Sequence, residues 1–458
     1  MRALSRTDAI LTGDIFNSMA EYKVAGGCLG LDQALEMTPE QVLRVLDDSG
    51  LRGRGGAGFP TSRKWRGTLE SEGERRFVVA NGAEGEPGTF KDRYLMRRNP
   101  YRVIEGLLIA VRTLGAERAY IGVKESFQRE TDALTRALTE FRQTYDLAER
   151  VEIILGPDEY LFGEEKALLE VVEGGLPLPR VFPPYIHGLF SGAYGGAATN
   201  PTAVNNAETL ANVPLIVRNG ASWFRRLGTP DSPGTMIFTV SGDVQTPVVE
   251  ELALGLSLRQ LLFEVAGGPR QGRSFKAIFP GLAGGLMTPA AFDLSLSFDS
   301  TRAAGASLGS AGFVVYDDSA CMARAAYLFS RFLHVESCNQ CPPCKLGSRL
   351  VTDSLERLLS GSGDPDDISA MREACGMVEN GQRCYLPTSE RSVISAILDA
   401  FPEDFTHHLA PQTCDLNHDF DLPKIVDYSE QSGFSLDKLY AYKQPDWTYD
   451  LPGSAGSV

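Results

Sequence analysis

The sequence predicts a mixed α/β and α+β protein of several domains. Its 458 residues divide into three stretches of different texture. In the first stretch, helix-period and strand-like segments alternate, which is typical of a parallel sheet covered by helices. In the second, short strands and Gly/Pro turns predominate, and in the third the apolar pattern is helical. We therefore expect an α/β domain over residues 1–230, a small α+β module over 234–318, a helical domain over 319–425 and an extended tail over 426–458.

The first stretch contains one clear helix and a series of short buried strands. Thr38 is a good N-cap, Pro39 suits a first turn, and apolar residues recur at helical spacing up to position 49. Three runs have the length and composition of buried strands: Phe77–Ala80, Ala119–Val123 and Val151–Leu155. Each run leads into a loop and then a helical pattern, so the strands should be parallel.

The second stretch has the pattern of a small α+β module. Met236–Val240 and Gly312–Tyr316 are expected strands, and a helix is expected near residues 257–266. Beyond residue 425, the Pro and Gly residues at 445, 452, 453 and 456 favour an extended or disordered tail.

Composition excludes several classes of function. The net charge of −15, without a Lys/Arg-rich run, argues against nucleic acid or an anionic membrane as a partner. We expect no membrane-spanning segment and no signal peptide, because the apolar runs are short and Met1–Ala20 lacks the required pattern. Eight cysteines, three of them clustered, suit metal ligation in a reducing compartment. The sequence therefore predicts a cytoplasmic protein.

The clustered cysteines are the most specific chemical signal. Cys338, Cys341 and Cys344 follow a C-x2-C-x2-C spacing, and Cys384 comes 40 residues later. Four thiolates of this kind can hold a cubane iron–sulfur cluster. A tetrahedral zinc site is the alternative, although zinc sites more often use two separated pairs of ligands. The spacing favours the cluster, and with it electron transfer.

A glycine-rich loop is a second candidate site. Residues 51–60 contain Gly53, Gly55, Gly56 and Gly58, so the backbone can closely approach a phosphate or a flat ring. The spacing G-x-G-x-x-G is that of a dinucleotide fingerprint, but a helix rather than a strand should precede it. The alternative is a flexible loop with solvated cations. Positive charge surrounds the loop at Arg52, Arg54 and Lys64.

Acidic residues follow two of the predicted strands. Asn81, Glu84 and Glu86 lie just after the first strand, where ligands of parallel sheets bind. Glu164 and Glu165 stand where a helix should begin after the third. Asn81 could hydrogen-bond the polar edge of a ring, and Glu84 or Glu86 could receive ligand hydroxyls. Glu164 and Glu165 are a second candidate site, or could simply complement the helix dipole.

Taken together, these segments resemble one family. The carrying motifs are Leu51–Trp65, Glu86–Arg93, Gly163–Glu165, Pro201–Asn206 and Glu336–Cys344. They are similar to the FMN-binding, NADH-oxidising subunit of respiratory complex I and to the diaphorase subunits of NAD-linked hydrogenases and formate dehydrogenases. The resemblance implies a Rossmann-like FMN domain, a ubiquitin-like β-grasp module of the soluble-ligand-binding type (SLBB), and a helical bundle that holds one [4Fe-4S] cluster.

The resemblance also assigns roles to individual residues. It implies FMN contacts at Arg54, Gly55, Gly56, Lys64, Asn81, Glu84, Glu86, Tyr160, Glu164, Val204, Asn205, Asn206 and Thr209, with Tyr385 and Leu386 between FMN and cluster. It places Glu165 beside the nicotinamide as the catalytic carboxylate, Phe59 on the adenine, and Tyr185 near the dinucleotide. Cys338, Cys341, Cys344 and Cys384 match the cluster ligands. The other thiols, at positions 28, 321, 375 and 414, match no ligand and are expected to be packing residues.

Four departures from this pattern affect the flavin and dinucleotide sides. Ala83 stands where the family has Asp, so one flavin-side carboxylate is missing, and Phe182 stands where the family has Lys. The aromatic that usually follows shortly after Lys-Trp is absent after Trp65, and about six residues are added within 186–203. Loss of the charged contact and of the stacking ring would cost about 1–3 kcal/mol each, and together they would weaken binding of the nicotinamide cofactor roughly 10²–10⁴-fold. Two functions therefore stay open: an NAD(H)-linked flavin enzyme, or an FMN/[4Fe-4S] conduit for another donor. In either case we expect iron–sulfur partner subunits, including a thioredoxin-like [2Fe-2S] subunit.

Overall fold

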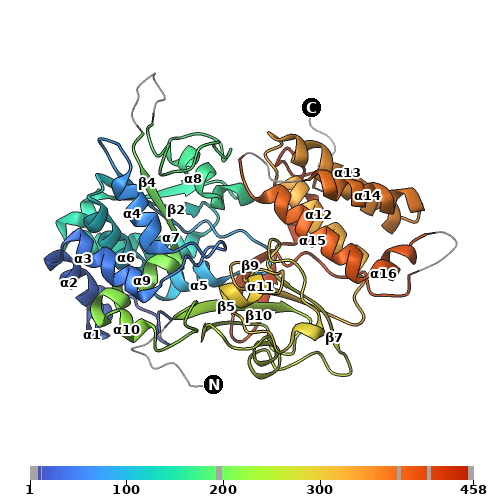
Figure 1. Cartoon of the computed structure of the whole chain (residues 1–458), viewed down its shortest axis with the longest axis horizontal. Coiled ribbons are helices and arrows are strands. Elements are labelled where there is room, and N and C mark those ends of the chain that lie inside the picture. The colour runs from blue at the N-terminus through green and yellow to red at the C-terminus, as the bar shows by residue number, and fades with distance from the viewer. Residues whose placement is uncertain (1–8, 12, 192–198, 379–382, 410–413, 452–458) are drawn as a thin grey trace.

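The computed structural model describes residues 9–11, 13–191, 199–378, 383–409 and 414–451. Three bodies are packed together: an α/β domain from the N-terminal part of the chain, a β-rich module below it, and a helical bundle beside both (Figure 1). We keep 1–230, 234–318 and 319–425 as proposed domain limits.

The α/β domain is built on a parallel sheet in the order β3-β2-β1-β4. Its strands are β1 (Phe77–Asn81), β2 (Arg118–Lys124), β3 (Val151–Gly156) and β4 (Thr202–Asn206). The first three contain the strands predicted from sequence. Since Asn81 pairs in register with Asn206 of β4 and Gly122 of β2, three chain segments finish side by side at one edge of the sheet.

Ten helices belong to the same domain: α1 (Met19–Val24), α2 (Leu29–Glu36), α3 (Pro39–Ser49), α4 (Thr61–Glu70), α5 (Lys91–Arg98), α6 (Pro100–Leu114), α7 (Gln128–Arg142), α8 (Glu165–Val172), α9 (Ala207–Asn219) and α10 (Ala221–Phe224). The predicted start of α3 is confirmed by a capping box between Thr38 and Gln41. Helices α6 and α9 pack very closely at Gly106, where a Cβ would lie 2.0 Å from the carbonyl oxygen of Leu210. Short 3-10 turns cover Asp146–Arg150 and Tyr160–Gly163.

The second body is a mixed sheet in the order β6-β5-β8-β7. Its strands are β5 (Thr235–Gly242), β6 (Val248–Ala253), β7 (Phe275–Pro280) and β8 (Gly312–Asp317). The central strands β5 and β8 are parallel, and both outer pairs are antiparallel, as in a β-grasp module. The predicted helix near 257–266 is present as a π-helix, Gln260–Val265, and the module also contains α11 (Phe298–Ala303) and a 3-10 turn, Pro289–Ala291.

The third body is the predicted helical bundle. It comprises α12 (Met322–Val335), a π-helix (Pro343–Ser348), α13 (Arg349–Leu359), α14 (Pro365–Met377), α15 (Leu386–Ala400) and α16 (Pro402–Thr406). Helix α12 packs against α13 and α15 around fully buried Phe329, Leu355 and Ile394. Among the described residues, no helix is both long and apolar enough to cross a membrane.

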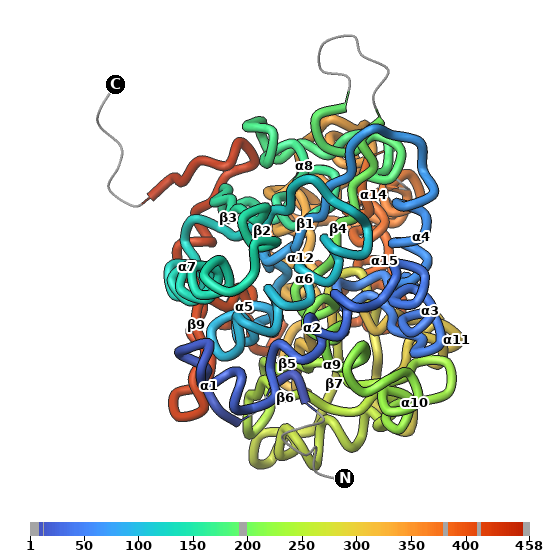
Figure 2. The backbone as a smooth tube through the Cα atoms, turned by 90° about the vertical axis from the view of Figure 1, so that its left-hand side faces the viewer, coloured from blue at the N-terminus to red at the C-terminus, as the bar shows by residue number. Residues whose placement is uncertain are grey.

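The extended tail predicted after residue 425 is wrong for the residues that the structure describes there. Strands β9 (Ile425–Ser429) and β10 (Gly433–Leu436) form an antiparallel hairpin, followed by a 3-10 turn, Lys438–Tyr442. Tyr428 is buried against the α/β domain and Tyr440 against the bundle. Asp427 pairs with arginines of α5 and α7, beside which β9 lies (Figure 2). The buried aromatics and ion pairs thus hold this segment against both the α/β domain and the bundle.

Candidate functional site

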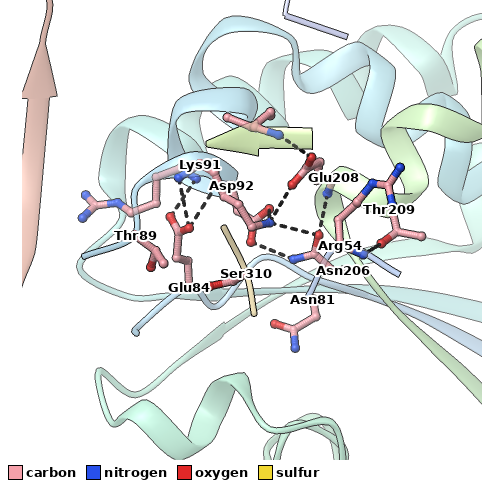
Figure 3. Close-up of polar contacts among 12 residues, drawn as sticks. Arg54, Asn81, Glu84, Thr89, Lys91, Asp92, Asn206, Glu208, Thr209 and Ser310 are labelled. Atoms are coloured by element: carbon pink, nitrogen blue, oxygen red, sulfur yellow. Dashed lines mark hydrogen bonds and ion pairs between the residues drawn. The ribbon is translucent and has the colours of Figure 1, made fainter. Parts of the chain in front are cut away.

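The candidate site is built where β1 and β4 end. Asn81 and Asn206 lie at this edge together with the glycine-rich loop, the turn after β1 and the start of α9 (Figure 3). Asn206 is the N-cap of α9, because its side chain accepts a hydrogen bond from the amide of Glu208 at 3.0 Å. The edge therefore combines helix N-termini with loop backbone, which suits an anionic ligand.

The glycine-rich loop connects α3 to α4, so it is not a strand-to-helix dinucleotide fingerprint. The Gly53 amide donates to the Phe59 carbonyl at 2.8 Å, and Arg52 Nε donates to the Gly58 carbonyl at 2.7 Å, which closes the loop. Gly56 has φ +125° with open space where a Cβ would be. Among the described residues, the amides of Gly56 and Ala57 donate to no other group of the chain. The loop thus has a closed base and free amides at its tip, a cradle that fits a phosphate or a flavin.

Arg54 lies on the inner side of this loop. Its amide donates to Thr209 Oγ1 at 2.8 Å, and its guanidinium donates to the Pro233 carbonyl at 3.2 Å. The side chain is fully buried, and this burial lowers the pKa of Arg54 to about 10. Arg54 thus fixes the loop to α9 and to the segment before β5. Its contact with FMN stays a prediction.

Lys64 brings three expected site residues together. Its Nζ lies 2.9 Å from Glu165 Oε2 and 3.0 Å from the Val204 carbonyl oxygen. Next to it, Trp65 donates its indole N–H to Asn205 Oδ1 at 2.8 Å. Since the carboxylate of Glu165 remains 39% exposed, this pair presents both charges at the open edge of the sheet.

Glu164 caps the N-terminus of helix α8, which is one of the two roles that the sequence allowed for it. Its carboxylate accepts hydrogen bonds from the amides of Lys166 at 2.8 Å and Ala167 at 3.0 Å, at the start of α8. Burial raises the pKa of Glu164 to about 7. Asn81 lies close by, because its amide group donates to the Gly163 carbonyl at 2.7 Å.

Glu84 and Glu86 point into the protein. Glu84 accepts from the amides of Lys91 at 3.0 Å and Asp92 at 3.3 Å and so caps α5 (Figure 3). Burial, with a smaller contribution from Asp92, raises the pKa of Glu84 to about 7. Glu86 accepts from the Ser310 hydroxyl at 2.6 Å and from an amide of the β-grasp module. Both carboxylates are held by protein donors, and their contact with FMN stays a prediction.

A buried charge network behind this edge was missed by sequence reasoning. Lys91 Nζ lies 2.8 Å from both Asp92 Oδ1 and Glu208 Oε2 (Figure 3). Asp92 Oδ2 also accepts from the Asn206 side chain at 2.7 Å. Burial alone would lower the pKa of Lys91, but the two carboxylates raise it. The network therefore locks the N-termini of α5 and α9 together.

A second network that the sequence did not reveal lies toward the helical bundle. Glu336 accepts from the Tyr160 amide at 2.8 Å and pairs with Lys443 Nζ at 3.0 Å. Lys424 Nζ donates to the Gly85 carbonyl at 3.1 Å. Burial, then the charge of Lys424, lowers the pKa of nearby Lys124 to about 7. These side chains link the turn after β1 to the residues just before Cys338.

The four predicted cluster cysteines gather at the near end of the bundle. Burial first, then the other three thiols, raises the pKa of Cys344 to about 12. This mutual influence places the four thiols at one site, as a metal centre with four thiolate ligands requires.

Tyr160 stands between the two candidate sites. Its ring packs edge-on against Phe332 of α12, with 5.1 Å between centroids. Burial, then the negative charges of Glu86 and Cys384, raises its pKa well above the ordinary value. Leu386, the first residue of α15, is buried beside the same cysteine, while Tyr385 is 60% exposed. The turn after β1 and the cysteine site are therefore neighbours.

Exposed aromatic side chains mark the expected dinucleotide side. Phe59, Phe182 and Tyr185 are each about half exposed, at 51%, 57% and 49%. Ala83, in place of the family's carboxylate, is buried and donates its amide to Asn81 Oδ1 at 3.1 Å. Most of the added Gly/Ala stretch, residues 192–198, lies outside the described residues. Binding of NAD(H) by Phe59, Glu165 and Tyr185 stays a prediction.

Two family models match the chain, and they define a class of flavin- and iron–sulfur-binding oxidoreductase subunits. The Nuo51 FMN-binding domain matches residues 46–215, and the NADH-ubiquinone oxidoreductase-F iron-sulfur binding region matches residues 324–408. The F 2 subunit of NADH-quinone oxidoreductase of Rhizobium meliloti (strain 1021) is 38% identical over 407 residues, which cover 86% of this chain and 95% of that protein. The chain belongs to the family of NADH-quinone oxidoreductase F subunits.

Two further comparisons extend the likeness to hydrogenases. NADP-reducing hydrogenase subunit HndC of Solidesulfovibrio fructosivorans is 32% identical, with 87% of this chain and 82% of that subunit covered. A chain of the NAD+-reducing [NiFe]-hydrogenase, in its air-oxidised crystal structure, superposes with a TM-score of 0.74 at 32% identity. That match covers 89% of this chain and 69% of the hydrogenase chain.

Proposed function

We propose that this chain exchanges a hydride between NAD(H) and FMN and passes electrons singly through a [4Fe-4S] cluster to partner subunits. Membership of the family makes it an NADH dehydrogenase-type oxidoreductase subunit with FMN and [4Fe-4S] as cofactors. When bound, FMN supplies two-electron exchange with a nicotinamide and one-electron exchange with the cluster. The observation that carries the proposal is Tyr160, whose ring lies beside Gly85 of the flavin turn, whose amide donates to Glu336, and whose pKa is raised in part by Cys384.

The residues at the sheet edge divide between holding FMN and shaping its surroundings. The free amides of the glycine-rich loop and the Lys64 cation supply the charge that a flavin phosphate needs. Asn81, Asn205 and Asn206 offer amide groups to polar ring or ribityl atoms. Behind them, Glu84 and Glu164 cap helices and so fix the pocket wall.

Glu165 is the residue that we place at the nicotinamide. Its partner Lys64 holds the carboxylate at the exposed edge, 2.9 Å away, where it can accept a hydrogen bond from a ligand. Phe59 offers an exposed ring for the adenine, and Tyr185 lies on the same dinucleotide side in our assignment. No protein acid or base is needed, because the cofactors carry the hydride chemistry.

Three lysines near the flavin turn and the bundle favour reduction of the cofactors. Lys424 and Lys124 lie beside Gly85 of the flavin turn, and Lys443 lies beside Glu336. Nearby positive charge stabilises the more negative, reduced forms of both cofactors and so raises their potentials.

The chain works as a subunit of a larger complex, as its relatives in complex I and hydrogenases do. We further propose that its partners include a thioredoxin-like [2Fe-2S] subunit. A cytoplasmic location, at the periphery of a membrane complex, also belongs to the proposal. Free cysteines in a metal-binding pattern support a reducing compartment.

Anaerobic mixing with nicotinamide cofactors tests this function. The purified chain, loaded with FMN and cluster, is mixed with NADH and separately with NADPH while the visible flavin absorbance is followed. We expect bleaching by at least one of the two, with a weak apparent affinity because Phe182 replaces a cation. If both leave the flavin oxidised at millimolar concentration while dithionite bleaches it, the chain is a conduit for a different donor.

A further inference from the structure

A group of four potential metal ligands lies away from the cluster cysteines. The ligand atoms of Cys321, His408, Cys414 and His418 all lie within 4.8 Å of one another. Cys321 Sγ is 3.4 Å from His408 Nε2, which is in turn 3.4 Å from His418 Nε2. We propose that this group binds one structural zinc ion. The proposal does not depend on the flavin or nicotinamide chemistry.

The distances fit a single tetrahedral ion. With bonds of about 2.3 Å to sulfur and about 2.0–2.1 Å to nitrogen, the ligands of a zinc ion stand roughly 3.3–3.8 Å apart. The two imidazole rings are inclined by 77°, so both can direct a nitrogen to one point. Two sulfurs and two imidazoles are a zinc set, whereas calcium and magnesium prefer oxygen. Simple packing, which the sequence favoured for both cysteines, does not require four donor atoms to converge.

The backbone holds these donors in place. Cys321 is the buried N-cap residue of α12. Its own amide donates to the Asn417 carbonyl at 3.0 Å, which ties the segment of Cys414 and His418 to the start of α12. Hydrogen bonds of this kind orient ligands before the metal arrives.

Helix α16 brings the remaining ligand, His408, to the same point. Asp404 of that helix accepts from the Met322 amide and from Lys276 Nζ of β7, both at 2.7 Å. The site therefore joins the β-grasp module, the bundle and the segment that continues to Pro423, whose carbonyl accepts from the Gly88 amide at 2.8 Å. Four protein ligands leave no open coordination position, so the zinc ion would be structural rather than catalytic.

Zinc content of the full chain tests the site. The protein, carrying FMN and iron–sulfur cluster, is dialysed against a mild chelator and its zinc measured by mass spectrometry. We expect about one zinc per chain, with two sulfur neighbours at about 2.3 Å and two nitrogens at about 2.0–2.1 Å in zinc-edge X-ray absorption. Cys414→Ser and His418→Ala should lose the zinc and keep iron and FMN. His407→Ala removes the adjacent, exposed histidine and should keep all three.

Several results would overturn the assignment. They are wild-type protein without zinc, another metal in this position, zinc that persists in both variants, or a Cys321–Cys414 disulfide in anaerobically prepared protein. The absorption measurement on the wild type decides the matter even if the variants fold poorly.

Discussion

The flavin side and the cluster side of this molecule bury carboxyl groups in different ways. Glu208, on the flavin side, is fully buried but meets Lys91 Nζ and the Ile237 amide, both at 2.8 Å. Glu390, in α15 of the bundle, is equally buried and accepts from the Ser330 hydroxyl at 2.6 Å. Burial raises the pKa of Glu390 to about 8. Burial raises the pKa of Glu208 as well, although its ion pair with Lys91 opposes that shift. Glu208 is therefore buried in an ion pair, whereas Glu390 is buried without a cation.

This difference indicates how each side is organised. Around the flavin edge, ion pairs and helix caps fix the loops before any cofactor binds, as Lys64, Lys91 and Glu84 illustrate. In the bundle, apolar side chains fill the core and the cysteines acquire their charge only as thiolate ligands. We therefore expect the flavin side to keep its fold without FMN, and the bundle to depend on its metal.

Loss of the cluster should have the largest effect. Cys384→Ser removes one of the four thiolates, so it should eliminate or convert the cluster and lower the thermal stability of the bundle, while FMN is retained. Iron, acid-labile sulfide, flavin content and thermal unfolding measure this. Cys375→Ser, a buried thiol of α14, is the control that keeps its iron. Zinc on the four motif cysteines without sulfide would contradict the cluster.

Gly56→Val should expel FMN and leave the cluster. Gly56 has a positive φ and open space at the tip of the loop, so a branched side chain would enter the space that the flavin needs. Gly272→Val imposes similar backbone strain at φ +75°, also into open space, but in the β-grasp module, and should retain flavin. Full FMN occupancy in the Gly56 variant would show that the loop is misassigned.

The two buried carboxyls should respond in opposite directions to amide substitution. A carboxyl group whose pKa is raised on folding lowers the stability of the fold at any pH above its ordinary pKa of 4.5. For Glu390 this loss of stability grows as the pH rises to about 8. Glu390→Gln should therefore stabilise the chain by about 3 kcal/mol at pH 7 and by little at pH 4.5. Glu208→Gln should destabilise it by about 3 kcal/mol, because Lys91 loses a buried partner. Denaturant unfolding at both pH values measures this, and similar behaviour of the two variants would remove the contrast.

The smallest expected effect is on the affinity for NADH. Phe59→Ala should weaken NADH by about 1–3 kcal/mol without loss of FMN, because an exposed ring that stacks on adenine adds only binding energy. Phe182→Lys should strengthen NADH if the missing cation limits affinity. The apparent affinity from flavin reduction measures both. Phe263→Ala, a 40% exposed ring of the β-grasp module, is the control that should match wild type.

Much of the fold could be predicted because its signals are local. The cap and proline of α3 lie within four residues, and the strand that became β1 carries its own buried pattern. The resemblance also predicted the β-grasp module and the cysteine-bearing bundle, whose family region matches residues 324–408. The site residues Lys64, Val204 and Glu165 do lie together, although their contact spans distant parts of the chain.

What could not be predicted depends on contacts between distant segments. Nothing in the sequence shows that Lys91 meets Glu208, that Lys424 reaches Gly85, or that Cys321 meets His408. The C-terminal hairpin was missed because prolines and glycines near the end outweighed Tyr428 and Tyr440, which bury against different domains. The inward direction of Arg54 likewise follows from its packing, since an arginine beside a glycine-rich loop could equally face a phosphate.

The central claim is that electrons from NADH pass through FMN to the cluster within this chain. Low-temperature electron paramagnetic resonance after anaerobic addition of NADH tests it most directly. We expect a reduced [4Fe-4S] signal in the wild type, and flavin bleaching without that signal in Cys384→Ser. If NADH bleaches the wild-type flavin but only dithionite produces the cluster signal, the two sites are not connected as proposed.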